Sequence, residues 1–208
     1  MFRQLAIAAP LLLAAPAMAQ TGPASPSALG GGGDWSGFYA GVQIDAVSGS
    51  ARFDFSGYDL SGVVPGVFVG YRHDFGGVVL GGELDYQRGR VTAGRDVDIA
   101  DRGDPPMIVR ENREPDLERL VRFGLEAGVE AGPALVYATA GWAHIAFEGE
   151  PTADSGGSGH FYGLGVDYAL GPRVSVGAEI LRHHFGDLGF AGYSADPVTL
   201  GLNLAVRF

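Results

Sequence analysis

The sequence contains no cysteine and no lysine among its 208 residues. Without cysteine the chain cannot form disulfides, zinc–thiolate sites, iron–sulfur clusters or a thiol nucleophile. All 14 basic residues are arginine, and the sequence has 24 acidic residues, so the formal net charge is −10. Because nucleic-acid binding requires a basic surface, this balance argues against a nucleic-acid partner.

Long hydrophobic runs are also missing. After the first twenty residues no apolar run approaches the ~18 residues that a membrane helix needs. The first twenty have the order of a secretory signal peptide, with Arg3, an apolar stretch over 5–15 and the small-residue site Ala17-Met18-Ala19. We predict a signal peptide over residues 1–19, a flexible Gly/Pro/Ser linker over 20–34 and one folded domain over 35–208.

Instead of helical periodicity, the domain shows alternation of apolar and polar residues with a period of two. At the C-terminus, Leu200, Leu202 and Leu204 share one face, and Asn203 and Arg207 lie on the other. The pattern predicts eight strands, at about 38–47, 63–73, 78–87, 117–130, 134–147, 160–169, 174–181 and 199–208. Over 134–147 both faces are mostly apolar, and we expect Val136, Ala138, Ala140 and Trp142 to point outward.

The predicted connections alternate between long and short. The long ones are 48–62, 88–116, 148–159 and 183–197, and the short ones are 74–77, 131–133 and 170–172. This alternation, with strands of roughly 10 residues, is typical of barrels that cross the outer membrane. Since no strand edge can stay unpaired in lipid, the eight strands must close. The predicted fold is all-β, an eight-stranded antiparallel up-and-down transmembrane β-barrel.

One face of the predicted strands carries charges interleaved with glycine, and the other is continuously apolar. In a transmembrane barrel the charged face points inward, where opposite charges pair and glycine leaves room for long side chains. A soluble sandwich with a solvated polar face is the alternative. We expect Arg122 to pair with Glu83, Glu126 or Glu179. The predicted interior charge network is Glu83, Asp85, Glu118, Arg122, Glu126, Glu130, Asp167, Glu179 and Arg207.

Aromatic residues on the apolar face fall near the predicted strand ends. Two aromatic girdles are expected where a barrel meets the two membrane–water interfaces. Ordinary strand propensity is the alternative explanation. The predicted girdle residues are Phe38, Tyr71, Tyr86, Tyr162 and Tyr168.

The segment from Asp34 to Val42, DWSGFYAGV, resembles the opening of the small outer-membrane surface-antigen barrels of alphaproteobacteria. That family is related in shape to opacity proteins and to the OmpA-type transmembrane domain. Weaker similarities are 166–170 and 206–208, and the resemblance covers 34–208. It implies residence in the cell outer membrane and roles in envelope integrity or surface contact, with no shared catalytic residues. Phe208 also looks like the C-terminal aromatic that the outer-membrane assembly machinery recognises, with an ordinary last apolar residue of the strand as the alternative.

Candidate chemistry is sparse. The five histidines include His183 and His184, which are adjacent and should face opposite ways on a strand, so they cannot share a metal. We expect the histidines to be solvated or interfacial and predict no metal and no cofactor. A lipid-modifying enzyme would need an outward Ser–His–acid set, and candidates such as Ser175 with Glu179 are predicted to face inward.

The charged segment from Arg88 to Asp116 is predicted to be a long, self-neutralising extracellular loop. Its arginines are candidates for bridging lipopolysaccharide phosphates, because the guanidinium fork suits phosphate. Four aspartates at positions 96, 98, 101 and 104 are a weak alternative for a divalent cation. The sequence thus predicts a non-enzymatic structural barrel whose partners are outer-membrane lipids and lipopolysaccharide. A narrow porin and a lipid-modifying enzyme are the alternative functions.

Overall fold

The computed structural model describes residues 34–53, 56–99, 107–113, 116–147, 156–186 and 194–208. Within these ranges no helix is long and apolar enough to span a bilayer. The described residues form nine strands: β1 (Gly37–Phe53), β2 (Ser56–Asp74), β3 (Val78–Ile99), β4 (Met107–Arg113), β5 (Asp116–Ala131), β6 (Ala134–Phe147), β7 (Gly156–Ala169), β8 (Val174–Phe185) and β9 (Ser194–Arg207). The proposed signal peptide and nearly all of the proposed linker lie outside the described residues.

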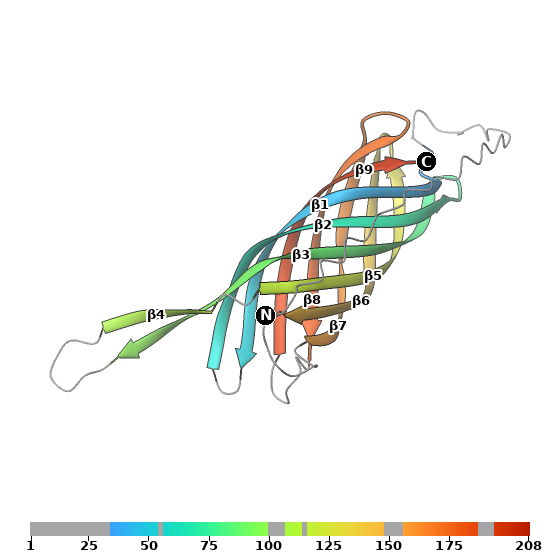
Figure 1. The fold of residues 1–208 in the computed structure, drawn as a ribbon. Coiled ribbons are helices and arrows are strands. Elements are labelled where there is room, and N and C mark those ends of the chain that lie inside the picture. Colours follow the sequence, from blue (N-terminus) through green and yellow to red (C-terminus); the bar gives the residue numbers. More distant parts are fainter. Residues whose placement is uncertain (1–33, 54–55, 100–106, 114–115, 148–155, 187–193) are drawn as a thin grey trace, which may run out of the picture.

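Eight of the strands close into an antiparallel barrel (Figure 1). Sequential strands pair along the sheet, β9 returns to pair with β1, and the β2–β3 pairing completes the ring. The ninth strand, β4, lies outside the ring and pairs with the distal part of β3. The predicted fold, an all-β barrel of eight antiparallel strands, is confirmed.

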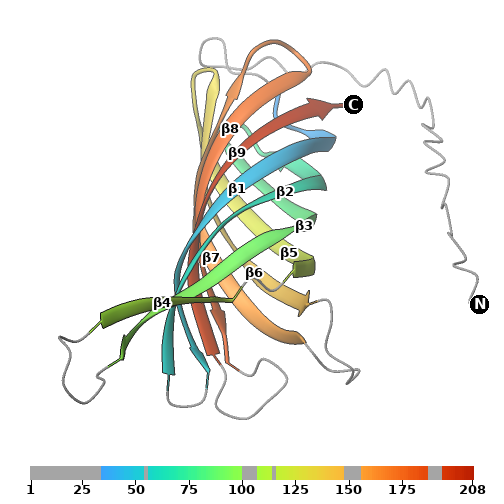
Figure 2. The ribbon, with the colours of Figure 1, turned by 60° about the vertical axis from the view of Figure 1, so that its left-hand side comes forward.

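The two ends of the barrel differ. The short turns and the C-terminal residue lie at one end, and the β3–β4 hairpin projects from the other (Figures 1 and 2). At the turn after β2, Asp74 Oδ1 accepts hydrogen bonds from the backbone N–H groups of Gly76 (2.7 Å) and Gly77 (2.9 Å). Both glycines have φ near +100°, a conformation that glycine adopts without steric cost.

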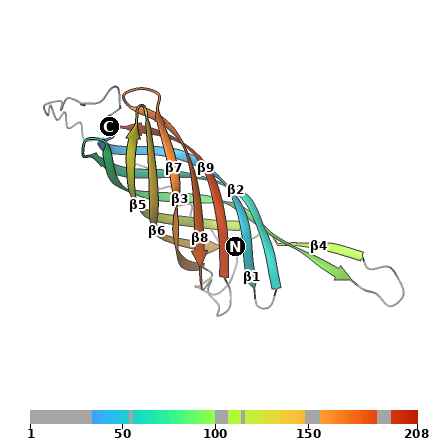
Figure 3. The same cartoon turned by 180° about the vertical axis from the view of Figure 1, so that it is seen from behind.

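The strands at the hairpin end are longer than the sequence pattern predicts. β1 reaches Phe53 and β2 begins at Ser56, so most of the predicted loop over 48–62 is strand. Likewise, the predicted loop over 88–116 is largely the hairpin of β3 and β4, seen from behind in Figure 3. β7 and β9 also begin earlier than predicted. Apolar alternation marks only the part of a strand that faces lipid, whereas the backbone hydrogen-bond ladder continues beyond it.

The outer wall of the barrel is apolar. Leu125, Leu164 and Leu202 each expose more than 60% of their surface, as expected for side chains that contact lipid. In β6, Leu135 and Tyr137 point inward and Val136 and Trp142 outward, which are the faces expected for that strand. The five predicted girdle residues all lie on the outer wall, with exposed fractions from 44% to 64%.

Inward-facing glycines make room for the large interior side chains. Cross-strand pairing sets Gly70 opposite Tyr39, Gly81 opposite Arg72 and Gly165 opposite Tyr137. A Cβ atom added at Gly81 would lie 2.8 Å from Arg72 Cγ. An eight-stranded barrel has an interior only wide enough for side chains, so each bulky residue needs a small neighbour.

Candidate functional site: the charged interior

The interior side chains are arranged in layers along the barrel axis. An apolar layer lies near the short turns and consists of Trp35, Val79, Leu135 and Tyr137. A larger apolar layer lies toward the hairpin end and consists of Ala51, Val64, Leu120, Ala143, Phe161, Leu181, Phe185 and Ala195. Charged side chains fill the space between these layers. The order is visible along β5, where Leu120 is followed by Arg122 and then Glu126.

Arg72 is the centre of the charged layer nearer the short turns. Its Nε donates to Glu126 Oε2 at 2.7 Å and its Nη1 donates to Asp167 Oδ2 at 2.6 Å. The guanidinium carbon lies 4.5 Å from the centre of the Tyr39 ring and 5.1 Å from that of Tyr137. Two carboxylates and two aromatic faces thus compensate a cation that is only 5% exposed.

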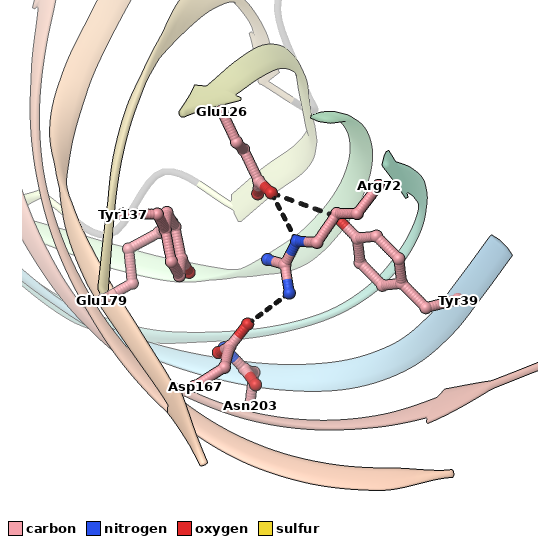
Figure 4. A network of polar contacts seen from close by, with 7 residues as sticks. All are labelled: Tyr39, Arg72, Glu126, Tyr137, Asp167, Glu179 and Asn203. Carbon is pink, nitrogen blue, oxygen red and sulfur yellow. Dashed lines mark hydrogen bonds and ion pairs between the residues drawn. The ribbon is translucent and has the colours of Figure 1, made fainter. Parts of the chain in front are cut away.

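Figure 4 shows the residues of this network converging in the barrel interior, and their positions in the sequence assign them to seven strands. The phenol of Tyr39 donates to Glu126 Oε2 at 3.4 Å and that of Tyr137 donates to Glu179 Oε2 at 3.3 Å. Asn203 Nδ2 donates to Asp167 Oδ1 at 3.4 Å. The seven residues, one from each of β1, β2, β5, β6, β7, β8 and β9, are Tyr39, Arg72, Glu126, Tyr137, Asp167, Glu179 and Asn203. The remaining barrel strand, β3, contributes Gly81, the glycine opposite Arg72.

Arg122 organises a second group of charges, built from β1, β3 and β5. Its Nη2 donates to Asp85 Oδ1 at 2.8 Å, and its Nη1 lies 3.4 Å from Asp45 Oδ2. Gln43 also donates to Asp85, at 2.8 Å, and Gln87 donates to Asp45 at 2.6 Å. Each carboxylate therefore accepts a hydrogen bond from an amide in addition to its contact with Arg122, which offsets the cost of burial.

Arg122 pairs with inward carboxylates, as expected, but its ion-pair partners are not the three glutamates named as candidates. It contacts Asp85 and Asp45, whereas Glu126 contacts Arg72 and Glu179 contacts Tyr137. Alternation along a strand predicts which residues point inward but not how far along the axis each one sits. The relative shift of neighbouring strands in the closed barrel sets that height, and so decides which charges meet.

The other predicted network residues are spread over the interior. Glu83 lies on β3 opposite Gly70 and Gly124. Glu130 is half-buried near a short turn, and the side chain of Glu118 lies outside the described residues. Arg207 is also half-buried, and its guanidinium carbon sits 4.8 Å from the centre of the Trp35 ring. Arg207 therefore belongs to the mouth at the short turns rather than to the central network.

Several interior residues were not predicted from the sequence. Arg72 and Asp45 are the most important, and both are at most 5% exposed. Each directly follows an outward apolar residue, Tyr71 and Ile44, so the alternation did contain the signal. Trp35 has no such signal because it precedes the first strand. It enters the mouth of the barrel, where Ser36 Oγ accepts a hydrogen bond from the backbone N–H of Asp74 at 3.0 Å.

One histidine is buried, contrary to expectation, and the serine and the acid that a catalytic triad would need contact two different histidines. His183 is neither solvated nor interfacial, because it is 1% exposed. Its ring is parallel to that of Phe185 and tilted relative to that of Phe161. On the outer wall His144 Nδ1 lies 3.1 Å from Ser158 Oγ, whereas the Asp196 carboxylate lies 2.6 Å from His184 Nδ1. A triad needs one histidine to contact both groups. Among the described residues, no three acidic or histidine side chains form a group that could hold a metal ion.

A family model described as "Outer membrane protein beta-barrel domain" matches residues 5–208. The chain belongs to this family. The predicted location in the outer membrane is thereby confirmed, and the end with the short turns is taken as periplasmic, as in other barrels of this kind. The narrower resemblance to surface antigens of alphaproteobacteria stays a prediction.

Solved structures similar to this chain include Neisserial surface protein A, with 19% identity and a TM-score of 0.50 over 83% of this chain and 98% of that one. OmpT, an outer membrane protease of Escherichia coli, has 10% identity and a TM-score of 0.49 over 83% and 97% of the two chains. Ail, the attachment invasion locus protein of Yersinia pestis, has 13% identity and a TM-score of 0.45 over 81% and 99%. No curated protein matches the chain. At these identities the similarity shows the fold alone.

Proposed function

We propose that the protein is a structural barrel of the outer membrane, which supports envelope integrity and makes surface contacts at its hairpin end. The observation that carries this proposal is the filled interior. A charged network drawn from seven strands lies between two apolar layers. Side chains that fill an eight-stranded barrel leave little room for solute. The filled interior therefore supports a role as a stable scaffold rather than as a channel.

Two features support contacts outside the barrel interior. The β3–β4 hairpin projects from the barrel and offers a surface on a rigid scaffold, where binding functions commonly sit. At the periplasmic edge Phe208 is 75% exposed, and its backbone N–H donates to the carbonyl of Phe38 at 2.9 Å. An accessible C-terminal aromatic on a paired strand suits recognition by the outer-membrane assembly machinery, and lipopolysaccharide is the proposed partner at the opposite edge.

Planar-bilayer recording of the full chain tests the proposal. We expect no stable large conductance, because both apolar layers and both arginine networks block the axis. Steady channels of nanosiemens scale that persist after deletion of residues 95–110 would contradict it and favour the porin alternative. A serine-directed covalent probe that labels Ser158 would instead favour a lipid-modifying enzyme.

A further inference from the structure

On five strands of the barrel the outward charged side chains are basic, although Arg72 and Arg122 are basic residues of the interior and Asp59 on β2 and Asp196 on β9 are outward acids. On β3, β5, β6, β7 and β8, every carboxylate whose side chain is described points into the interior. On the same five strands the first outward position above the apolar band carries an arginine or a histidine. We call these residues and the next outward ones on β3 and β8 the rim belt: Arg88, Arg90, Arg119, His144, His160, Arg182 and His184. A basic outer belt is not expected from composition alone, because the chain has 24 acidic and only 14 basic residues.

The rim belt begins where the lipid-facing surface ends. Along β3 the outward series runs from Leu84 through Tyr86 to Arg88, and along β7 it runs from Tyr162 to His160. Tyrosine and tryptophan are enriched at membrane–water interfaces. The aromatic residues therefore place the belt at the level of the lipid headgroups, on the side of the barrel that carries the hairpin.

On β6, β7 and β8 the histidines of the belt lie side by side with Trp142. Cross-strand pairing sets Trp142 beside His160 and His160 beside His184, whose rings lie 5.2 Å apart. The Trp142 ring also stacks on His144, at 5.8 Å and 12°. Beyond His184 the surface meets Asp196, whose Oδ1 lies 2.6 Å from His184 Nδ1. The Asp196 carboxylate therefore marks the edge of the basic surface on this side of the barrel.

We propose that the rim belt is a binding site for the phosphate groups of outer-leaflet glycolipids. A guanidinium group donates two parallel hydrogen bonds to a phosphate, which an ammonium group cannot do, and every basic residue of this chain is arginine. Arginine can also rest its apolar stem on the wall while its charge reaches the headgroups. The proposal rests on the proposed structural role, and it moves the predicted lipopolysaccharide contact from an extracellular loop to the barrel wall.

The position of the belt favours a lipid over a soluble anion. Its residues lie on the convex outer wall directly above an apolar band that lipid chains must cover. A glycolipid can therefore contact the wall with its acyl chains and the arginines with its phosphates at the same time. A free phosphate ion would make only the second contact.

Trp142 offers a direct readout. In a Trp35→Phe background it is the only tryptophan, since the sequence contains two. We would reconstitute this protein in phosphatidylcholine vesicles with increasing amounts of diphosphoryl lipid A and follow Trp142 emission. We expect a saturable change whose midpoint rises roughly tenfold for each of Arg119→Gln and Arg182→Gln, about the effect of one lost charge-assisted contact.

Arg173→Gln is the matched control, because it removes the same charge from an exposed position near the periplasmic turn. Its midpoint should equal that of the parent protein, and heat-modifiable migration on gels should show that all variants fold. An equal midpoint in all four proteins would overturn the proposal, as would an equal loss in the Arg173 variant. An identical emission change with inorganic phosphate in vesicles of phosphatidylcholine alone would overturn the assignment to lipid.

Conductance measured on the same preparations separates this inference from the proposed function. Suppose that the parent protein conducts ions, and that its Trp142 emission change with lipid A is lost in the two arginine variants. This result would refute the sealed scaffold and support the belt. A barrel that shows no conductance and whose Trp142 emission does not change with lipid A would support the sealed scaffold and refute the belt.

Discussion

Arg72 holds carboxylates from β5 and β7 together in the middle of the barrel, and it does so between two tyrosine rings. A charge buried in this way is stable only while its partners remain. If the arginine were removed, Glu126 and Asp167 would face each other in a medium of low polarity without compensation.

We therefore expect Arg72→Ala to lower the free energy of unfolding by about 3–5 kcal/mol, the usual cost of removing one partner of a buried ion pair. Urea unfolding of the reconstituted barrel, followed by tryptophan emission, measures this difference. Arg173→Ala removes an exposed arginine and should change the free energy of unfolding little. Equal effects of the two substitutions would show that Arg72 is not held in a buried network.

A second residue-scale prediction concerns the space left by glycine. The Cβ of Gly81→Ala would lie 2.8 Å from both Arg72 Cγ and the carbonyl oxygen of Tyr71. Because the backbone oxygen cannot move away easily, we expect a loss of about 1–3 kcal/mol from overpacking. Gly171→Ala is the control, since its Cβ would meet nothing within 4 Å. Unfolding midpoints of the two variants in urea should differ clearly, with Gly171→Ala close to the parent.

At the scale of elements, the β3–β4 hairpin extends the barrel wall into water. Its register sets Arg95 opposite Glu111 and Asp96 opposite Arg110. The predicted self-neutralising character of this segment thus has a structural counterpart in strand pairing rather than in a loop.

The hairpin should be dispensable for folding. The β3–β5 pairing that closes the barrel spans Val78 to Arg90 and uses no residue of β4. Deleting residues 95–110 should therefore leave a barrel that still shifts its apparent mass between unheated and boiled detergent gels. Loss of that shift, while full-length protein prepared in parallel retains it, would mean that the hairpin helps to close the ring.

At the scale of the whole molecule, we predict that the chain is exported with a cleaved signal peptide before it folds in the membrane. The Ala17-Met18-Ala19 site predicts that the mature protein begins at Gln20 and fractionates with the outer membrane. Sequencing the N-terminus of protein purified from outer-membrane fractions checks both points. A sequence that starts at Met1, or protein recovered in the soluble periplasm, would contradict the prediction.

Much of the fold could be read from the alternation of residue types. Period two fixes the face of every residue relative to its neighbours, which is why the inward position of Asp85 and the outward position of Leu84 were predictable. The same rule applied to Tyr71 would have found Arg72 as an inward residue. The strand ends at the hairpin side were not predictable in this way, because strands in water need no apolar face.

The sequence by itself determined the class of fold, the lipid-facing wall and the charged interior, since a periodicity of two and a shortage of interior space act locally along each strand. Only the tertiary structure decided which charges meet. Arg72 and Asp167 are 95 positions apart, and they come together because closing eight staggered strands brings their inward positions to one height in the barrel. The same closure brings Trp35 into the periplasmic mouth beside Arg207 and sets His160 beside His184 on the wall. Alternation carries no information on that stagger, because it is a property of the closed ring and not of any one strand.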